Sequence, residues 1–107
     1  MHPASLKIPE SALVVGLGIS GLWSARWLAE KGSGVTVSDL RPESELDPDM
    51  VSEVRELGCI LETGEHRIET FLGKDAIVVS PGVPLDIEPL EKARDTVSYT
   101  HLTLPTN

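Results

Sequence analysis

The chain has 107 residues, with 9 basic and 17 acidic side chains and a formal net charge of −8. That length fits one domain, and 40% hydrophobic beside 24% charged residues is typical of a folded globular protein. The acidic balance argues against nucleic acid as a partner, because affinity for a phosphate backbone comes from clustered Lys and Arg. No apolar run is long enough to cross a membrane. The single Cys59 favours a reducing compartment, so we expect a cytoplasmic protein.

Short apolar runs separated by glycines predict strands that alternate with helices. In chain order, we predict strands over 12–15, 35–38, 59–62 and 76–79, and helices over 19–31, 50–57, 68–72 and 89–94. A polar, acidic loop is expected over 40–49. This alternation indicates a parallel sheet with right-handed crossovers. The predicted fold class is therefore α/β: a Rossmann-like open parallel sheet with helices on both faces.

The segment 97–107 departs from this pattern. It carries no Asp, Glu, Lys or Arg and alternates polar with apolar residues where a fifth strand is expected. The string resembles a translated sequencing adapter, so we expect a non-native tail there. The native domain is then expected over 1–96, incomplete at its C-terminal strand. The alternative is a genuine edge strand over 97–104.

The sequence GLGISG, which follows the first predicted strand, matches a phosphate-binding G-x-G-x-x-G pattern. Gly16 permits a tight turn, Gly18 lets phosphates approach the backbone, and Gly21 lets helix and strand pack closely. The N–H groups of Ile19 and Ser20 are then expected to face an anion at the start of the helix. The pattern predicts nucleotide binding without naming the nucleotide.

Two charged residues stand at the end of the second predicted strand. Asp39 lies about 20 residues after the glycines, where a carboxylate commonly accepts a hydrogen bond from a ribose hydroxyl. It can equally accept one from a base N–H, and the alternative is a turn aspartate. Arg41 can stack on a base or pair with a phosphate. These spacings leave NAD, FAD and other nucleotides open.

The fourth predicted strand ends in the sequence SPGVP, residues 80–84. It lies at the carboxyl edge of the sheet, where ligands bind in open α/β folds. Its two prolines make the loop stiff, and Gly82 leaves room for a flat ring against the backbone. The alternative is a rigid turn that binds nothing.

Three stretches in this order, VVGLGISGL, VTVSD and VVSPGVP, resemble the N-terminal domain of the Mur ligases, most of all the D-glutamate-adding type. The resemblance spans residues 12–94. It implies a Rossmann-like domain that binds no NAD and holds the UDP part of UDP-N-acetylmuramoyl-L-alanine. It also implies a longer ATP-dependent ligase of peptidoglycan biosynthesis, whose ATP, Mg²⁺ and D-glutamate bind central and C-terminal domains that we expect to be absent here.

The same resemblance assigns roles to individual residues. The N–H groups of Ile19 and Ser20 would contact the diphosphate, Asp39 would bond the uracil edge, and Gly82 would close over the ring. The family often carries a hydroxyl residue where Leu40 stands, so only a backbone contact is expected there. The implied UDP-binding residues are Gly18, Ile19, Ser20, Gly21, Asp39, Leu40, Arg41 and Gly82.

No catalytic residue, cofactor site or metal site is expected in this chain. The only Gly-Lys pair, Gly73-Lys74, is followed by Asp75 where a P-loop requires Ser or Thr. Cys59 and His66 lack metal-ligand spacing. We therefore expect the chain alone to be inactive.

Two alternative functions remain at this point. One is the FAD- or NAD-binding Rossmann domain of an oxidoreductase such as a flavin amine oxidase, whose FAD-binding start Gly18–Leu22 and Leu28–Lys31 also resemble. The other is a non-catalytic nucleotide-sensing module.

Overall fold

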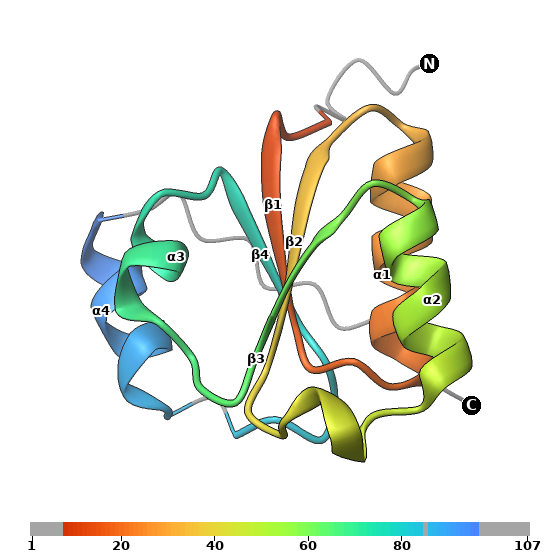
Figure 1. Ribbon diagram of the computed structural model, residues 1–107. Coiled ribbons are helices and arrows are strands. Elements are labelled where there is room, and N and C mark those ends of the chain that lie inside the picture. Colours follow the sequence, from red (N-terminus) through yellow and green to blue (C-terminus); the bar gives the residue numbers. More distant parts are fainter. Residues whose placement is uncertain (1–7, 85, 97–107) are drawn as a thin grey trace.

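The computed structural model describes residues 8–84 and 86–96, in which strands and helices alternate as predicted (Figure 1). The elements are β1 (Ser11–Val15), α1 (Ile19–Glu30), β2 (Gly34–Asp39), the 3-10 turn η2 (Glu43–Glu45), α2 (Pro48–Glu56), β3 (Ile60–Thr63), α3 (Ile68–Leu72), β4 (Ala76–Val79) and α4 (Glu88–Thr96). Within these ranges no helix has the length and apolar character of a membrane span. The tail predicted over 97–107 lies outside the described residues.

The four strands form one parallel sheet in the order β3-β2-β1-β4. The chain moves outward from β1 to β2 and β3, then returns to the far side of β1 to form β4. Val15 at the end of β1 is in register with Ser38 of β2 and Val79 of β4. The strand order therefore reverses between β1 and β4, and open α/β sheets bind ligands outside the carboxyl ends of their strands at such a point.

Helices cover both faces of the sheet, which confirms the predicted fold class. In Figure 1 α1 and α2 lie on one side of the strands, and α3 and α4 lie on the other. Alternate residues of β1 enter different cores: Ala12 and Val14 face the first core, and Leu13 and Val15 face the second with Phe71. A strand buried on both faces needs apolar residues at every position, which explains the uninterrupted apolar runs.

Several boundaries differ from the prediction by one or two residues. The helix predicted to begin at residue 50 begins at Pro48, because the Asp47 carboxylate accepts a hydrogen bond from the Asp49 N–H at 2.8 Å. Proline is favourable at a first helical position, where its missing N–H would lack a helical partner in any case. The polar loop predicted over 40–49 is therefore shorter and also contains η2.

Candidate nucleotide-binding site

The glycine loop has the geometry that its sequence predicts. Gly16 has a φ of +96°, and its N–H donates to the Ser38 carbonyl at 2.8 Å. A Cβ on Gly21 would lie 2.0 Å from the Gly16 carbonyl oxygen, whereas a Cβ on Gly18 would meet nothing within 4 Å. The tight turn predicted at Gly16 and the close packing predicted at Gly21 are confirmed. Gly18 borders open space.

The backbone N–H groups at the N-terminus of α1 have no capping side chain and border that space. Gly18 is the N-cap residue and supplies no side-chain hydrogen bond, and the first turn of α1 contains no acidic residue. The N–H groups of the first helical residues, Ile19 and Ser20, therefore keep the positive end of the helix dipole open to an anion. Ile19 is 70% exposed beside them.

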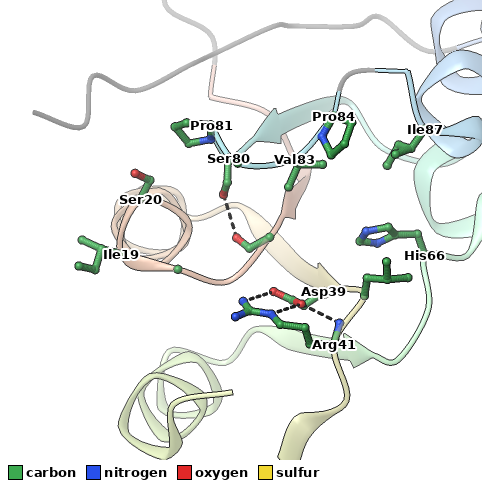
Figure 2. Close-up of a pocket in the computed structure, with 14 residues that line it drawn as sticks. Ile19, Ser20, Asp39, Arg41, His66, Ser80, Pro81, Val83, Pro84 and Ile87 are labelled. Atoms are coloured by element: carbon green, nitrogen blue, oxygen red, sulfur yellow. Dashed lines mark hydrogen bonds and ion pairs between the residues drawn. The ribbon is translucent and has the colours of Figure 1, made fainter. Parts of the chain in front are cut away.

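Asp39 is the buried anchor of the site. Its side chain accepts hydrogen bonds from the Leu17 N–H at 2.7 Å and the Arg41 N–H at 2.9 Å, and from the Arg41 guanidinium at 2.9 and 3.0 Å (Figure 2). Burial opposes ionisation, but the Arg41 side chain and the two N–H donors outweigh it and lower the pKa of this carboxyl below 3.8. Asp39 is thus ionised and committed to protein donors, a positioning role that its spacing did not indicate.

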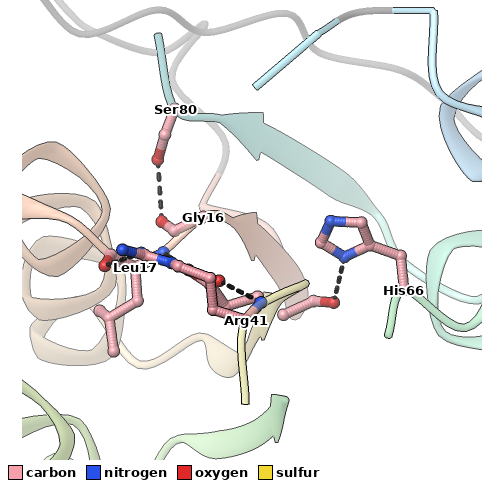
Figure 3. Close-up of polar contacts among 7 residues, drawn as sticks. Gly16, Leu17, Arg41, His66 and Ser80 are labelled. Atoms are coloured by element: carbon pink, nitrogen blue, oxygen red, sulfur yellow. Dashed lines mark hydrogen bonds and ion pairs between the residues drawn. The ribbon is translucent and has the colours of Figure 1, made fainter. Parts of the chain in front are cut away.

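Arg41 closes the same network from the surface. Besides Asp39, its guanidinium donates to the Leu17 carbonyl oxygen at 3.1 Å (Figure 3). The side chain is 52% exposed, so its outer edge faces solvent at the rim of the pocket. Leu40, between the two charged residues, is 63% exposed. Contacts of Asp39, Leu40 and Arg41 with a nucleotide stay a prediction.

The loop after β4 is tied to the glycine loop through Ser80. The Ser80 hydroxyl donates to the Gly16 carbonyl at 2.9 Å, and its N–H donates to the Val15 carbonyl at 3.0 Å. The Val83 N–H donates back to the Ser80 carbonyl at 3.0 Å and closes a turn around Gly82. A Cβ on Gly82 would meet nothing within 4 Å, so its face is open, as the interpretation of SPGVP required.

His66, which the sequence analysis set aside, belongs to the site. Its Nδ1 lies 2.8 Å from the Ser38 hydroxyl oxygen, and its ring meets the Phe71 ring edge-on at 5.7 Å between centroids. Burial lowers its pKa from 6.5, against the opposing charge of Asp39, so the imidazole is neutral near pH 7. Figure 2 shows the ring between the β4 loop and the end of β2.

These segments enclose a pocket of about 620 Å³ at the carboxyl edge of the sheet. Seven of the eight residues predicted for the site line it, and Gly21 lies beneath it in the contact between helix and strand. The pocket is lined by Gly16, Gly18, Ile19, Ser20, Asp39, Leu40, Arg41, His66, Ser80, Pro81, Gly82, Val83, Pro84 and Ile87. Ser80 could be predicted from the sequence, because it directly follows the predicted strand over 76–79. His66 also follows a strand, β3, but β3 lies at the edge of the sheet and is separated from β1 by β2, so its position in the sequence did not predict a place in the pocket.

The pocket combines a helix N-terminus, whose dipole favours a negative charge, with an apolar loop and a few fixed polar groups. In the described ranges no three His, Cys, Asp or Glu side chains gather as a metal site would require. The fold and the position of this pocket together define a domain of the Rossmann-like α/β class.

Comparison with known proteins identifies the family. The model of the Mur ligase MurD-like N-terminal domain matches residues 10–98, and the chain belongs to that family. It is 51% identical over 83 residues to the UDP-N-acetylmuramoylalanine--D-glutamate ligase of Desulfosudis oleivorans, a match that covers 78% of this chain. The chain spans 18% of that ligase's length.

Solved structures agree with this assignment. A pseudomurein peptide ligase type C from Methanothermus fervidus superposes with a TM-score of 0.66 at 28% identity, over 86% of this chain and 19% of the ligase. The L-tryptophan dehydrogenase of Nostoc punctiforme superposes with a TM-score of 0.58 at 20% identity, over 86% of this chain and 26% of the dehydrogenase. The second likeness shows the fold alone, so it gives the oxidoreductase alternative no separate support.

Proposed function

We propose that this chain is the domain that binds the UDP group of UDP-N-acetylmuramoyl-L-alanine within a longer ligase that adds D-glutamate. The observation that carries the proposal is the pocket formed jointly by the glycine loop and the loop after β4, in a chain of the MurD-like N-terminal family. The matched relatives carry that ligase activity in their names.

In this proposal, different residues of the pocket contact different parts of the nucleotide. The N–H groups of Ile19 and Ser20 receive the diphosphate at the start of α1. Arg41 adds positive charge at the rim, and Gly82 lies against the flat base. Asp39 holds Leu17 and Arg41 in place through the four hydrogen bonds that its carboxylate accepts, and so positions the groups around the ligand. Gly18 and Gly21 admit the phosphates and seat the helix, and Leu40 offers its backbone.

ATP and Mg²⁺ belong, in this proposal, to other domains of the longer enzyme. Gly73 and Lys74 precede β4, so they lie at the amino edge of the sheet, opposite the pocket. The Lys74 ammonium donates to the Thr36 hydroxyl at 3.3 Å. These residues do not fit a phosphate-binding P-loop, and no residue of this chain is assigned a catalytic role. The single free Cys59, which is buried, accords with a cytoplasmic enzyme.

Calorimetric titration of the chain with UDP, and separately with NAD, tests the proposal. We expect saturable binding of UDP and of UDP-N-acetylmuramoyl-L-alanine. NAD should bind at least about tenfold more weakly, which is roughly the effect of losing one charged hydrogen bond. Tight NAD binding without UDP binding would support the oxidoreductase alternative and overturn the proposal.

A further inference from the structure

Both oxygens of the Asp39 carboxylate are taken up by donors of the protein itself. Oδ1 accepts from the Arg41 N–H at 2.9 Å and from Arg41 Nε at 3.0 Å. Oδ2 accepts from the Leu17 N–H at 2.7 Å and from Arg41 Nη2 at 2.9 Å. An ionised carboxylate offers about four acceptor positions. The four donors therefore leave none of them to a ligand.

Two of these hydrogen bonds come from the Arg41 guanidinium and form a bidentate pair. Nε and Nη2 each meet a different oxygen of Asp39, the fork geometry that matches arginine to a carboxylate. Nη2 also donates to the Leu17 carbonyl oxygen at 3.1 Å, and Figure 3 shows the side chain reaching to Leu17 in the glycine loop. The guanidinium thus bridges the end of β2 and the glycine loop.

In Rossmann domains that bind dinucleotides, a sugar lies at the corresponding place. An acidic residue after the second strand accepts a hydrogen bond from the ribose 2′-hydroxyl of NAD, while the pyrophosphate lies at the start of the helix. That hydroxyl and its 3′ neighbour need free acceptor positions on the carboxylate. This chain has the glycine loop and the acidic residue, but the Arg41 fork occupies the edge of Asp39 that a ribose would use.

We propose that Arg41 excludes adenine dinucleotides by occupying the ribose-binding edge of Asp39. The nucleoside of a bound ligand is then left to the other side of the pocket, against Gly82 and the loop after β4. The inference rests on the proposed function, since it requires a nucleoside diphosphate in this pocket. It makes Arg41 the residue that separates this site from a dinucleotide site of the same fold.

Removing the Arg41 side chain should free that edge. In Arg41→Ala the Leu17 N–H and the backbone N–H at position 41 still fill one position on each oxygen, and one position on each becomes free. ADP and 2′,3′-dideoxy-ADP are the probes, because they differ only in the hydroxyls that would bind there. Calorimetry on the full 107-residue chain measures both affinities, and thermal melting reports folding.

The unsubstituted chain should show no preference between the two probes. Arg41→Ala should bind ADP about tenfold more tightly than dideoxy-ADP, as new hydrogen bonds to a charged acceptor would produce. The ratio of the two affinities is the readout, because loss of a positive charge weakens both diphosphates alike. A purely structural change creates no preference for ribose hydroxyls.

Two further variants complete the experiment. Arg55→Ala is the matched control, since Arg55 forms a similar bidentate pair with Glu43, at 2.7 and 2.9 Å, outside this pocket. It should show no preference between the probes. Arg41→Lys keeps a cation beside Asp39, which protects the fold, but it lacks the planar fork. It should prefer ADP by about threefold.

A preference for ADP in the unsubstituted chain or in Arg55→Ala overturns the inference, as does its absence from both Arg41 variants. Loss of cooperative melting in both Arg41 variants overturns it too, because Arg41 would then serve folding and not exclusion. If the unsubstituted chain fails to bind UDP, the proposed function falls and this inference with it. If UDP binds and neither Arg41 variant prefers ADP, only the inference falls.

Discussion

The wall of the pocket built from the glycine loop and β2 is fixed by buried charge, whereas the wall after β4 is fixed by one serine and two prolines. On the first wall, Asp39 gathers the Leu17 N–H and the Arg41 side chain within 3.0 Å. On the second, Ser80 alone donates a side-chain hydrogen bond, to Gly16. The contrast indicates that more polar contacts hold the first wall than the second, so substitutions in the first wall should cost more stability.

Replacing a glycine of the fixed wall should have the largest effect. In Gly21→Ala the new Cβ would meet the Gly16 carbonyl oxygen at 2.0 Å, so α1 must move off β1. We expect a loss of about 3 kcal/mol in the free energy of unfolding, measured by urea denaturation.

Gly18→Ala is the matched control, because its Cβ meets nothing within 4 Å and its φ of −125° suits alanine. It should fold nearly as well as the unsubstituted chain yet bind UDP more weakly, since the methyl group occupies the space over the glycine loop. Equal destabilisation by the two substitutions would contradict the separate roles given to these glycines.

Removing the charge of the fixed wall should have the next largest effect. Asp39→Asn takes away an acceptor for Leu17 and Arg41 in a site that is 4% exposed, which should cost about 2 kcal/mol. The same change at exposed Asp49 should alter stability by less than about 0.5 kcal/mol. If Asp39→Asn proves as mild as Asp49→Asn in urea denaturation, buried charge does not hold this wall.

Substitutions in the second wall should reduce stability less. Ser80→Ala removes one hydroxyl–carbonyl bond and should destabilise the chain by about 1 kcal/mol. Exposed Ser52 on α2 gives the control, because its alanine variant should lose no stability. A loss at Ser80 as large as that at Asp39 would abolish the difference between the two walls.

Lowering the pH should reduce the free energy of unfolding in two steps, the first from His66 and the second from Asp39. The pKa of His66 is lowered from 6.5 by burial, despite the charge of Asp39. The unfolded chain therefore takes up this proton first, and a small stability contribution, complete above pH 6.5, is lost as the pH falls below it.

A second loss should follow below pH 3.8, because hydrogen bonds outweigh burial and lower the pKa of Asp39 from that value. Unfolding free energies measured from pH 8 to 3 should show the first step in the unsubstituted chain but not in His66→Gln, and the second step should be smaller in Asp39→Asn. A smaller loss should remain there, because Arg55 also lowers the pKa of Glu43. A pH profile that is identical in all three would contradict both assignments.

The sheet and the glycine loop were predictable because their signals are local. Apolar runs such as Ala76–Val79 and the positions of Gly16 and Gly21 specify strand, turn and helix contact within a few residues. The start of α2 was predicted two residues late because Pro48 was assigned to the loop. Its Asp47 cap made it a helix start instead.

The hydrogen bonds of the site were not predictable, because they join segments that are distant in the sequence. His66 meets Ser38 only because β2 turns successive side chains to opposite faces, Ser38 toward Phe71 and Asp39 toward Leu17. Spacing placed Asp39 at the ligand, but it could not show that four hydrogen bonds from the protein already reach its carboxylate.

The central claim is that the glycine loop and the loop after β4 form the two sides of one UDP site. Amide chemical shifts of the ¹⁵N-labelled chain, followed while UDP is added, test it most directly. We predict saturable shifts that are largest at Ile19, Ser20 and Gly82, which border the pocket from its two sides. Unmoved amides at these three residues, or the same shifts produced at lower concentration by NAD, would contradict the account.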